Sequence, residues 1–451
     1  MTVTETGPSR TGRLASAWRA GPLSAPGFRL LTFGQFASTV GDYCYAIALP
    51  WLVLSGGGSA ASLGIVLACY GIPRALLTVP GGALTDRFSP RRVMLAADIG
   101  RCALTAVFAV LAATHVSSLA AVAPVAVLLG SFSALFMPAS MAMMPSLVAP
   151  SGLTAANSVY AGFVQVGSML GPAIGGVLVA TTGAATAFAV DAGSFLASAV
   201  SLAFIAVPPA AKAPAAEPAD VAAVADTVRA AAPAGTAAEV PGSVWALLRR
   251  SRVLQIILVV VLSANFALVG TTEVALPALA HARFGAGGYG AVLTGMAVAA
   301  LAGALVVGKL GDRFRPVTLI AGSLILGAAA IAAAPFLGGL PGVAGGLAVF
   351  GIATGFDNVV SVTLIQRWAP PAMLGRVWGL LTLASVGSFP VATLVAGLLV
   401  RHFGPTPVFP ISGALLALSM AYGLTRREFR EFGSEDKERL SADKGLSPAG
   451  S

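Results

Sequence analysis

Apolar stretches long enough to cross a lipid bilayer recur along almost the whole 451-residue chain. One crossing takes about 20 residues as a helix, and Gly, Pro or charged residues separate these stretches. Hydrophobic residues make up 57% of the chain and charged residues 10%, a composition that water-soluble globular proteins do not show. We predict an all-α membrane protein with twelve transmembrane helices, which begin near residues 29, 61, 93, 119, 155, 184, 253, 289, 317, 340, 373 and 405.

Lysine and arginine gather on one side of the predicted membrane. With a cytoplasmic N-terminus, 23 of the 27 basic residues fall in the N-terminal segment, the inner loops and the C-terminal tail. This asymmetry predicts that both termini are cytoplasmic, and it accounts for the net charge of +9. A nucleic-acid partner would require one basic patch, whereas these residues are scattered over many loops. We therefore expect no nucleic-acid partner.

One long segment departs from the apolar pattern, because Pro208–Gly242 is rich in Ala and Pro with interspersed charges. Such a sequence does not pack a core and predicts a loose cytoplasmic linker, with a short surface helix at 220–232 as the alternative. The linker divides the helices into six and six. The predicted units are a cytoplasmic N-terminal segment 1–28, an N-terminal bundle 29–206, the linker 207–252, a C-terminal bundle 253–425 and a cytoplasmic tail 426–451.

A nine-residue loop sequence occurs once in each half. GALTDRFSP at residues 82–90 and GKLGDRFRP at 308–316 agree at six of nine positions, and both follow the second predicted helix of their half. An internal repeat explains this agreement better than chance does. The two halves are therefore predicted to be pseudo-symmetric six-helix bundles.

With the N-terminal copy, GGALTDRFSPRR, the chain resembles the major facilitator superfamily over about residues 28–425. The resemblance implies two halves that rock about a central site to open each side of the membrane in turn. It also implies that this loop and the start of the eleventh helix brace the halves on the cytoplasmic side. A charge cluster that merely flanks the membrane is the plainer interpretation. The residues of this predicted cytoplasmic gate are Gly82, Asp86, Arg87, Arg91, Arg92, Gly308, Asp312, Arg313 and Arg376.

A glycine-rich motif, GSMLGPAIGG, occupies residues 167–176 in the fifth predicted helix. Gly167, Gly171 and Gly175 are four residues apart, so they share one face and let a second helix approach closely. Pro172 bends the helix at that point. The partner face that we predict, in the eighth helix, consists of Gly295, Ala299 and Gly303.

The same motif, including Gly176, is similar to one found in antiporters of the superfamily. A generic glycine packing face is the alternative interpretation. Within the superfamily, the opening FRLLTFGQFASTVGDYCYAIALPWLVL and the tripeptide IPR at 72–74 resemble macrolide-efflux-like drug exporters. The resemblance implies export of drugs by exchange with protons.

Ionisable residues inside a bilayer are costly and are functional candidates by default. Helix depth places Asp42 and Asp357 near the middle of the membrane and Glu273 nearer its outer side. Burial favours the protonated form of a carboxylate, so such a group can exchange a proton when its side of the cavity opens. Asp42 is the first candidate for proton exchange, followed by Glu273 and Asp357. The polar residues expected to line the cavity with them are Gln35, Gln165 and Asn265.

The arginine that drug exporters of the superfamily carry in the fourth helix has no counterpart in residues 119–140. Other intramembrane charges have a structural interpretation. Asp98 and Arg101 lie three residues apart on one helix face, which predicts an ion pair that Arg74 could join.

No catalytic or metal-binding pattern emerges from the sequence. His115, His281 and His402 fall in separate predicted outer loops, where isolated imidazoles are usually surface residues. GALVVGKL at 303–310 lacks the Ser or Thr that a phosphate-binding loop requires. We expect no enzyme, no metal site and no cofactor.

These observations predict a secondary active transporter that exports small amphipathic or lipophilic compounds in exchange for protons. A cavity lined mostly by apolar residues suits such compounds better than sugars or phosphates. The expected partners are a small-molecule substrate, protons and the lipid bilayer, for a monomer in a bacterial inner membrane. Alternatives on the same fold are export of an endogenous metabolite or siderophore, and nutrient uptake. An alternative of another class is a non-transporting membrane receptor or assembly factor.

Overall fold

The computed structural model describes residues 21–205, 248–249, 251–310, 316–369 and 371–430. Within these ranges the chain is helical and has no strand, and twelve helices are long and apolar enough to cross a membrane. Their first residues lie within five positions of the predicted starts, which confirms the predicted fold class. The predicted N-terminal segment, linker and tail lie largely outside the described residues.

The spanning helices fall into two sets of six. The first set comprises α2 (Pro26–Ser55), α3 (Ala60–Phe88), α4 (Pro90–Ala113), α5 (Leu119–Met143), α6 (Leu153–Thr182) and α7 (Ala184–Phe204). The second begins with α10 (Arg252–Val269), which continues through the π-helix η4 (Gly270–Ala275) into α11 (Leu276–Arg283) as one span. It continues with α12 (Gly285–Leu310), α13 (Pro316–Ala333), α14 (Gly339–Trp368), α15 (Pro371–Phe403) and α16 (Val408–Thr425), followed by the short α17 (Arg427–Arg430).

Short turns with local breaking signals separate these helices. Ser59 caps α3, since its hydroxyl accepts a hydrogen bond of 3.2 Å from the amide of Ser62. Between α6 and α7 a single residue, Gly183, turns the chain at a φ of +89°, a conformation that side chains disfavour. Tight turns of this kind reverse the direction of the chain, so that consecutive helices run antiparallel.

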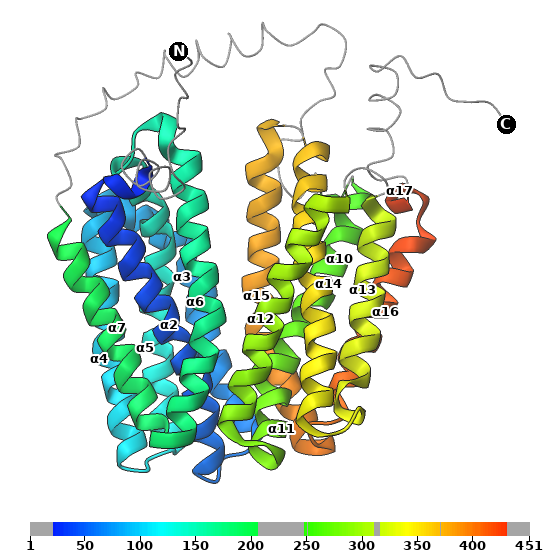
Figure 1. The fold of residues 1–451 in the computed structure, drawn as a ribbon, viewed down its shortest axis with the longest axis horizontal. Coiled ribbons are helices and arrows are strands. Elements are labelled where there is room, and N and C mark those ends of the chain that lie inside the picture. Colours follow the sequence, from blue (N-terminus) through cyan, green and yellow to red (C-terminus); the bar gives the residue numbers. More distant parts are fainter. Residues whose placement is uncertain (1–20, 206–247, 250, 311–315, 370, 431–451) are drawn as a thin grey trace, which may run out of the picture.

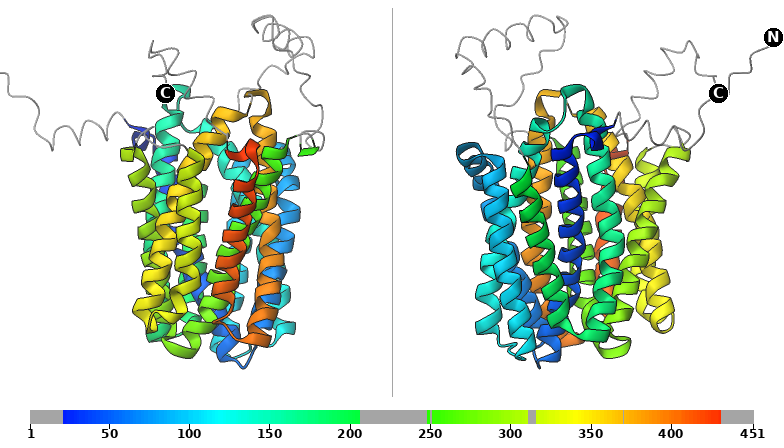
Figure 2. Two further views of the ribbon diagram at one scale, coloured as in Figure 1. Left: turned by 90° about the vertical axis from the view of Figure 1, so that its right-hand side faces the viewer. Right: turned by 60° about the vertical axis from the view of Figure 1, so that its left-hand side comes forward.

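Each set of six forms its own bundle, and the two bundles stand side by side (Figure 1). In the N-terminal half α2 packs on α6 and α7, while α5 packs on α3 and α4. In the C-terminal half α14 packs on α12 and α13, and α10 packs on α15 and α16. The views of Figure 2 show the spanning helices running along a common direction in both halves.

Two helix pairs carry most of the contact between the halves, α3 with α15 and α6 with α12. Among the described residues, close approaches gather at the end remote from the termini, which we call the far end. There a Cβ at Gly64 would lie 3.2 Å from the Cα of Gly397, and one at Gly176 would lie 3.0 Å from the Cα of Gly290. At the opposite end, the termini end, the two bundles stand apart in Figure 1.

Aromatic side chains add to the far-end contact between the halves. The indole of Trp51 on α2 stacks on the ring of Tyr289 on α12, with 6.1 Å between centroids. The imidazole of His281 on α11 meets the same indole edge to face at 5.7 Å. The hydroxyl of Tyr289 donates a hydrogen bond of 2.9 Å to the carbonyl of Thr272, which anchors this contact to the π-helix.

The outer surface of both bundles is apolar. Leu76, Phe204 and Leu418 are among the large hydrophobic side chains with roughly two thirds or more of their surface exposed, at 69%, 75% and 69%. A soluble monomer rarely shows so much apolar surface, whereas lipid solvates it without cost. The exposure therefore agrees with a multi-pass membrane protein.

Candidate substrate cavity

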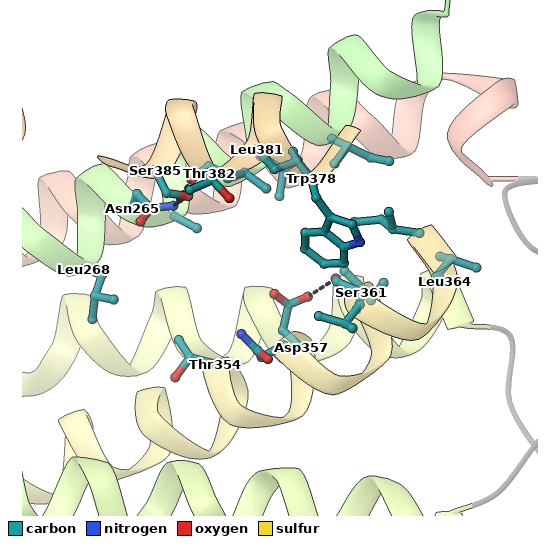
Figure 3. A pocket seen from close by; sticks show the side chains of 18 of the residues that line it. Asn265, Leu268, Thr354, Asp357, Ser361, Leu364, Trp378, Leu381, Thr382 and Ser385 are labelled. Carbon is teal, nitrogen blue, oxygen red and sulfur yellow. Dashed lines mark hydrogen bonds between the residues drawn. The ribbon is translucent and has the colours of Figure 1, made fainter. Parts of the chain in front are cut away.

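A cavity of about 430 Å³ lies within the C-terminal half, bounded by α10, α13, α14, α15 and the residue Phe429 of α17 (Figure 3). Ten of its nineteen lining residues are aliphatic, two are aromatic, six are polar without charge, and one, Asp357, is charged. An apolar cavity with a few polar groups is the usual form of a small-molecule site. The polar groups with their aromatic neighbour are Asn265, Thr354, Asp357, Asn358, Ser361, Trp378, Thr382 and Ser385.

Asp357 is half-buried on α14, four residues from the middle of that helix toward the termini end. The hydroxyl of Ser361, one turn further along, donates a hydrogen bond of 3.0 Å to its Oδ1. No ion pair involves Asp357 among the described residues. Figure 3 shows the indole of Trp378 on α15 across from this carboxylate.

The opposite wall of the cavity carries Asn265 of α10. Its amide donates hydrogen bonds to the hydroxyl of Ser385 on α15 at 3.2 Å and to the carbonyl of Val261 at 2.9 Å. The amide therefore links α10 with α15, and its carbonyl oxygen stays available to a ligand. Figure 3 shows Thr382 beside this pair.

The polar residues predicted for the cavity do not all meet there. Asn265 and Asp357 line it together, whereas Asp42, Gln35, Gln165 and Glu273 do not. Gln35 donates a hydrogen bond to Thr39 within α2, and Gln165 donates one to Ser168 within α6, both at 3.3 Å. The sequence gave no means of deciding which polar helix faces enclose a common space.

Asp42 lies near the middle of α2 with an exposed side chain, and no described residue forms a hydrogen bond or ion pair with it. The guanidinium groups of Arg101 and Arg74 are nevertheless within electrostatic reach of its carboxylate. Arg74 itself donates a hydrogen bond of 3.4 Å to the hydroxyl of Tyr70 and lies over that ring. The acidic Asp98 is also within electrostatic reach of Asp42.

Glu273 belongs to the π-helix η4, a local widening of the helix that is frequent at functional sites. Its side chain is half-buried, and it lies within electrostatic reach of Tyr43 in the N-terminal half and Tyr289 in the C-terminal half. Glu273 therefore lies close to the far-end contact. The sequence offered no signal for the π-helix itself.

Asp98 and Arg101 form an ion pair inside the N-terminal half, with 0% and 6% of their side-chain surface exposed. The guanidinium of Arg101 lies between the rings of Phe136 on α5 and Phe195 on α7, 4.2 Å from each centroid. Asp191 on α7 is also buried, and its Oδ1 lies 2.5 Å from the place that a Cβ at Gly41 would take. These contacts join α4, α5 and α7, which suits a structural interpretation of the pair.

The glycines of the fifth spanning helix, α6, pack inside the N-terminal half. A Cβ at Gly167 would lie 3.0 Å from Thr39, and one at Gly171 would lie 2.6 Å from Tyr43, both on α2. The predicted partner face on α12, residues 295, 299 and 303, is wrong, because Gly303 packs on Ile352 and no described residue lies within 4 Å of a Cβ at Gly295. The face of α6 that meets α12 is the adjacent one.

The predicted gate residues lie at the termini end. Asp86, Arg87 and Arg92 are exposed, whereas Arg91 donates hydrogen bonds to the carbonyls of Leu202 at 2.9 Å and Ala203 at 2.5 Å, which ties α4 to α7. No described residue lies within 4 Å of a Cβ at Gly82, and Arg376 is exposed on α15. Asp312 and Arg313 lie outside the described residues, as do the surroundings of Gly308. The gate contact stays a prediction.

Known proteins resemble this chain over most of its length. The model of the Major Facilitator Superfamily matches residues 31–340 and 274–448. "Multidrug efflux pump Tap" of Mycobacterium tuberculosis is 30% identical over 380 residues, which covers 82% of this chain and 85% of that protein. "Enterobactin exporter EntS" of Citrobacter koseri is 26% identical over 415 residues, 90% of this chain and 93% of that protein.

Solved structures show the same fold at low identity. The nucleoside transporter NupG superposes with a TM-score of 0.67 at 14% identity, over 88% of this chain and 98% of that one. A bacterial homologue of the iron transporter ferroportin gives a TM-score of 0.67 at 15% identity, over 90% and 98% of the two chains. The relatives are transporters rather than enzymes. The twelve spanning helices, the two bundles and the family match together establish that the chain belongs to the major facilitator superfamily.

Proposed function

We propose that the protein exports small amphipathic or lipophilic compounds in exchange for protons, through alternating access. The observation that carries the proposal is the uneven contact between the halves, which gathers at the far end while the cavity with Asp357 lies in the C-terminal half. Two bundles that touch at one end leave the space between them open at the other end. Rocking the bundles against each other would exchange the open side.

The direction of transport is inferred from the relatives. Tap is a multidrug efflux pump by its name, and the chain shares 30% identity with it. With the termini in the cytoplasm, as the distribution of Lys and Arg suggests, the open termini end would accept a compound from the cell interior. The bacterial relatives favour a bacterial inner membrane, and we propose that one chain works as a monomer.

Protons are the proposed coupling ion because the membrane interior holds carboxylates that lack an ion pair. Asp42, Glu273 and Asp357 are in this group among the described residues. Each elementary charge moved down a potential of 100 mV supplies roughly 2.3 kcal/mol. Asp42 is the first candidate for the exchanging group, since it lies near mid-membrane with an exposed side chain.

Transport in proteoliposomes tests the proposal. Protein reconstituted with a pH gradient, acidic inside, should accumulate a lipophilic dye, and a protonophore should abolish the accumulation. Asp42→Asn should lose gradient-driven accumulation while it still exchanges dye in both directions. Accumulation that ignores the gradient and the protonophore would contradict proton exchange.

Siderophore export is the second candidate, because the chain is also 26% identical to EntS over 90% of its length. The same proteoliposomes distinguish the two candidates when a catecholate siderophore replaces the dye. Uptake of the siderophore without uptake of any dye would favour this candidate over drug efflux.

A further inference from the structure

We propose that the cavity of the C-terminal half binds a lipophilic organic cation, with Asp357 as its counter-charge and Trp378 as its aromatic wall. The inference names the substrate class for the proposed function and rests on it for the claim that the cation is exported. Binding itself can be tested without transport.

The charge balance of the cavity selects a cation. Asp357 is the one charged residue among the described residues that line it, and no Lys, Arg or His is among them. A carboxylate in an apolar site needs a compensating charge or a proton. An organic cation supplies that charge, whereas an anion would meet the carboxylate with no basic group to offset the repulsion.

Asp357 differs in this respect from Asp42. Asp42 does not line this cavity, and both the basic Arg101 and Arg74 and the acidic Asp98 lie within electrostatic reach of its carboxylate. The carboxylate of Asp357 has one hydrogen bond, from the hydroxyl of Ser361, and no ion pair in the described part of the chain. A cation bound in this cavity therefore meets the carboxylate of Asp357 and not that of Asp42.

The aromatic wall narrows the class of cation. Trp378 lies across from Asp357 in Figure 3, and indole is the aromatic side chain that attracts cations most strongly. A small hydrated cation would lose its water here, because most of the lining is aliphatic. A cation whose charge is spread over an apolar body loses little hydration when it binds, and its apolar surface packs against the aliphatic walls. At about 430 Å³, the cavity falls in the size range of drug sites.

The uncharged polar groups of the cavity allow ligands of different polarity to bind and do not select one particular ligand. The amide of Asn265 and the hydroxyl of Ser385 already bond to one another on the wall opposite Asp357. They can accept or donate one further bond each without leaving a buried group unpaired. A ligand without polar substituents is thus accepted as well as one with them. The charge and the size of a ligand therefore decide whether it binds in this cavity.

Three probes of similar shape test the proposal with detergent-purified full-length protein. They are tetraphenylphosphonium, a cation; tetraphenylborate, an anion; and triphenylphosphine oxide, which is neutral. Equilibrium dialysis should show binding of the cation well above that of the anion. In Asp357→Asn the affinity for the cation should fall by about tenfold or more, while that for the neutral probe is unchanged.

Further variants separate charge and aromatic contact from folding. Asp357→Glu keeps the charge and should retain binding of the cation, and thermal unfolding in detergent verifies that each variant is folded. Trp378→Leu should weaken binding of the cation by about three- to thirtyfold, and Trp378→Phe should weaken it less.

Three binding results would contradict the inference. Asp357→Asn that binds the cation like the wild type, with the loss found in Asp42→Asn or Glu273→Gln instead, would place the counter-charge elsewhere. A wild type that binds the anion as tightly as the cation, or none of the probes, would be equally incompatible with it. Binding through Asp357 without gradient-driven transport would leave this inference standing and overturn the proposed export.

Discussion

The pair formed by Asp98 and Arg101 is the most deeply buried charge contact among the described residues. Removing one partner leaves an uncompensated charge in an apolar interior, which costs much more than the pair contributes when intact. We expect Arg101→Gln to lower the free energy of unfolding by about 3–5 kcal/mol. Arg101 also lies between two aromatic rings, so a small residue at this position loses packing as well.

Unfolding in detergent, followed by helical circular dichroism, measures this effect. The double variant Asp98→Asn with Arg101→Gln should be more stable than Arg101→Gln alone. The pair of Arg252 and Glu428 is the matched control, because its side chains are 70% and 45% exposed and exposed pairs contribute about 0–1 kcal/mol. If breaking either pair lowered the free energy of unfolding equally, burial of Arg101 would not determine what the loss of its partner costs.

The amino-acid sequence indicated some of the residues that line the cavity and not others. Asp357 and Asn265 stood out because charge and amide groups are rare inside apolar helices. Trp378, Ser361 and Ser385 were missed, since an isolated Trp or Ser in an apolar helix is ordinary and its neighbours lie on other helices. A pattern within one helix cannot identify which residues of several helices enclose a cavity.

At the scale of elements, the contact of α6 with α12 has no room for a side chain. A Cβ at Gly176 would lie 3.0 Å from the Cα of Gly290 and 3.1 Å from the carbonyl of Ala286. We expect Gly176→Val to separate the halves at the far end. Spin labels on the far-end turns of the two halves, measured by pulsed electron resonance, should report longer distances than in the wild type.

Two other glycines of α6 serve as controls for that substitution. Gly171→Val should destabilise the fold, since a Cβ there would lie 2.6 Å from Tyr43 within the same half. Gly162→Ala should neither destabilise the fold nor lengthen the far-end distances, because nothing in the described part of the chain lies within 4 Å of its Cβ position. Far-end distances that Gly176→Val leaves unaltered would contradict the importance of this helix contact.

Helix length and hydropathy predicted all twelve spans, because a bilayer fixes the length of an apolar helix. The partner of the glycine face was predicted wrongly. A row of small residues shows that a helix approaches closely, and α2 and α12 both lie against α6. Gly167, Gly171 and Gly175 meet α2, while Gly176, one residue further round the helix, meets α12.

For the whole molecule, the far-end contact predicts a specific cross-link. A Cβ at Gly287 on α12 would lie 3.7 Å from the Cβ of Ala180 on α6, a separation that a disulfide spans. In protein whose three natural cysteines are replaced, the pair Ala180→Cys and Gly287→Cys should form a disulfide under mild oxidation. The cross-link should stop transport, because it holds the halves together at the far end.

Mass spectrometry of digested protein detects that cross-link, and dithiothreitol should restore transport. A pair on α3 and α15, the other two helices that join the halves, is the control: Val79→Cys and Leu383→Cys lie nearer the termini end, and these side chains are 75% and 58% exposed. Oxidation of the control pair with the same yield would contradict a structure that is open at the termini end.

Proton release on substrate binding tests the central claim most directly, namely that compound and proton compete during the cycle. A pH-sensitive dye in weakly buffered detergent solution would follow wild type, Asp42→Asn and the control Glu428→Gln, whose carboxylate is 45% exposed at the end of the C-terminal bundle. We predict release in the wild type and in Glu428→Gln, and none in Asp42→Asn. Unchanged release in Asp42→Asn would assign the exchange to Glu273 or Asp357. No release from the wild type, with compounds that demonstrably bind, would contradict proton exchange.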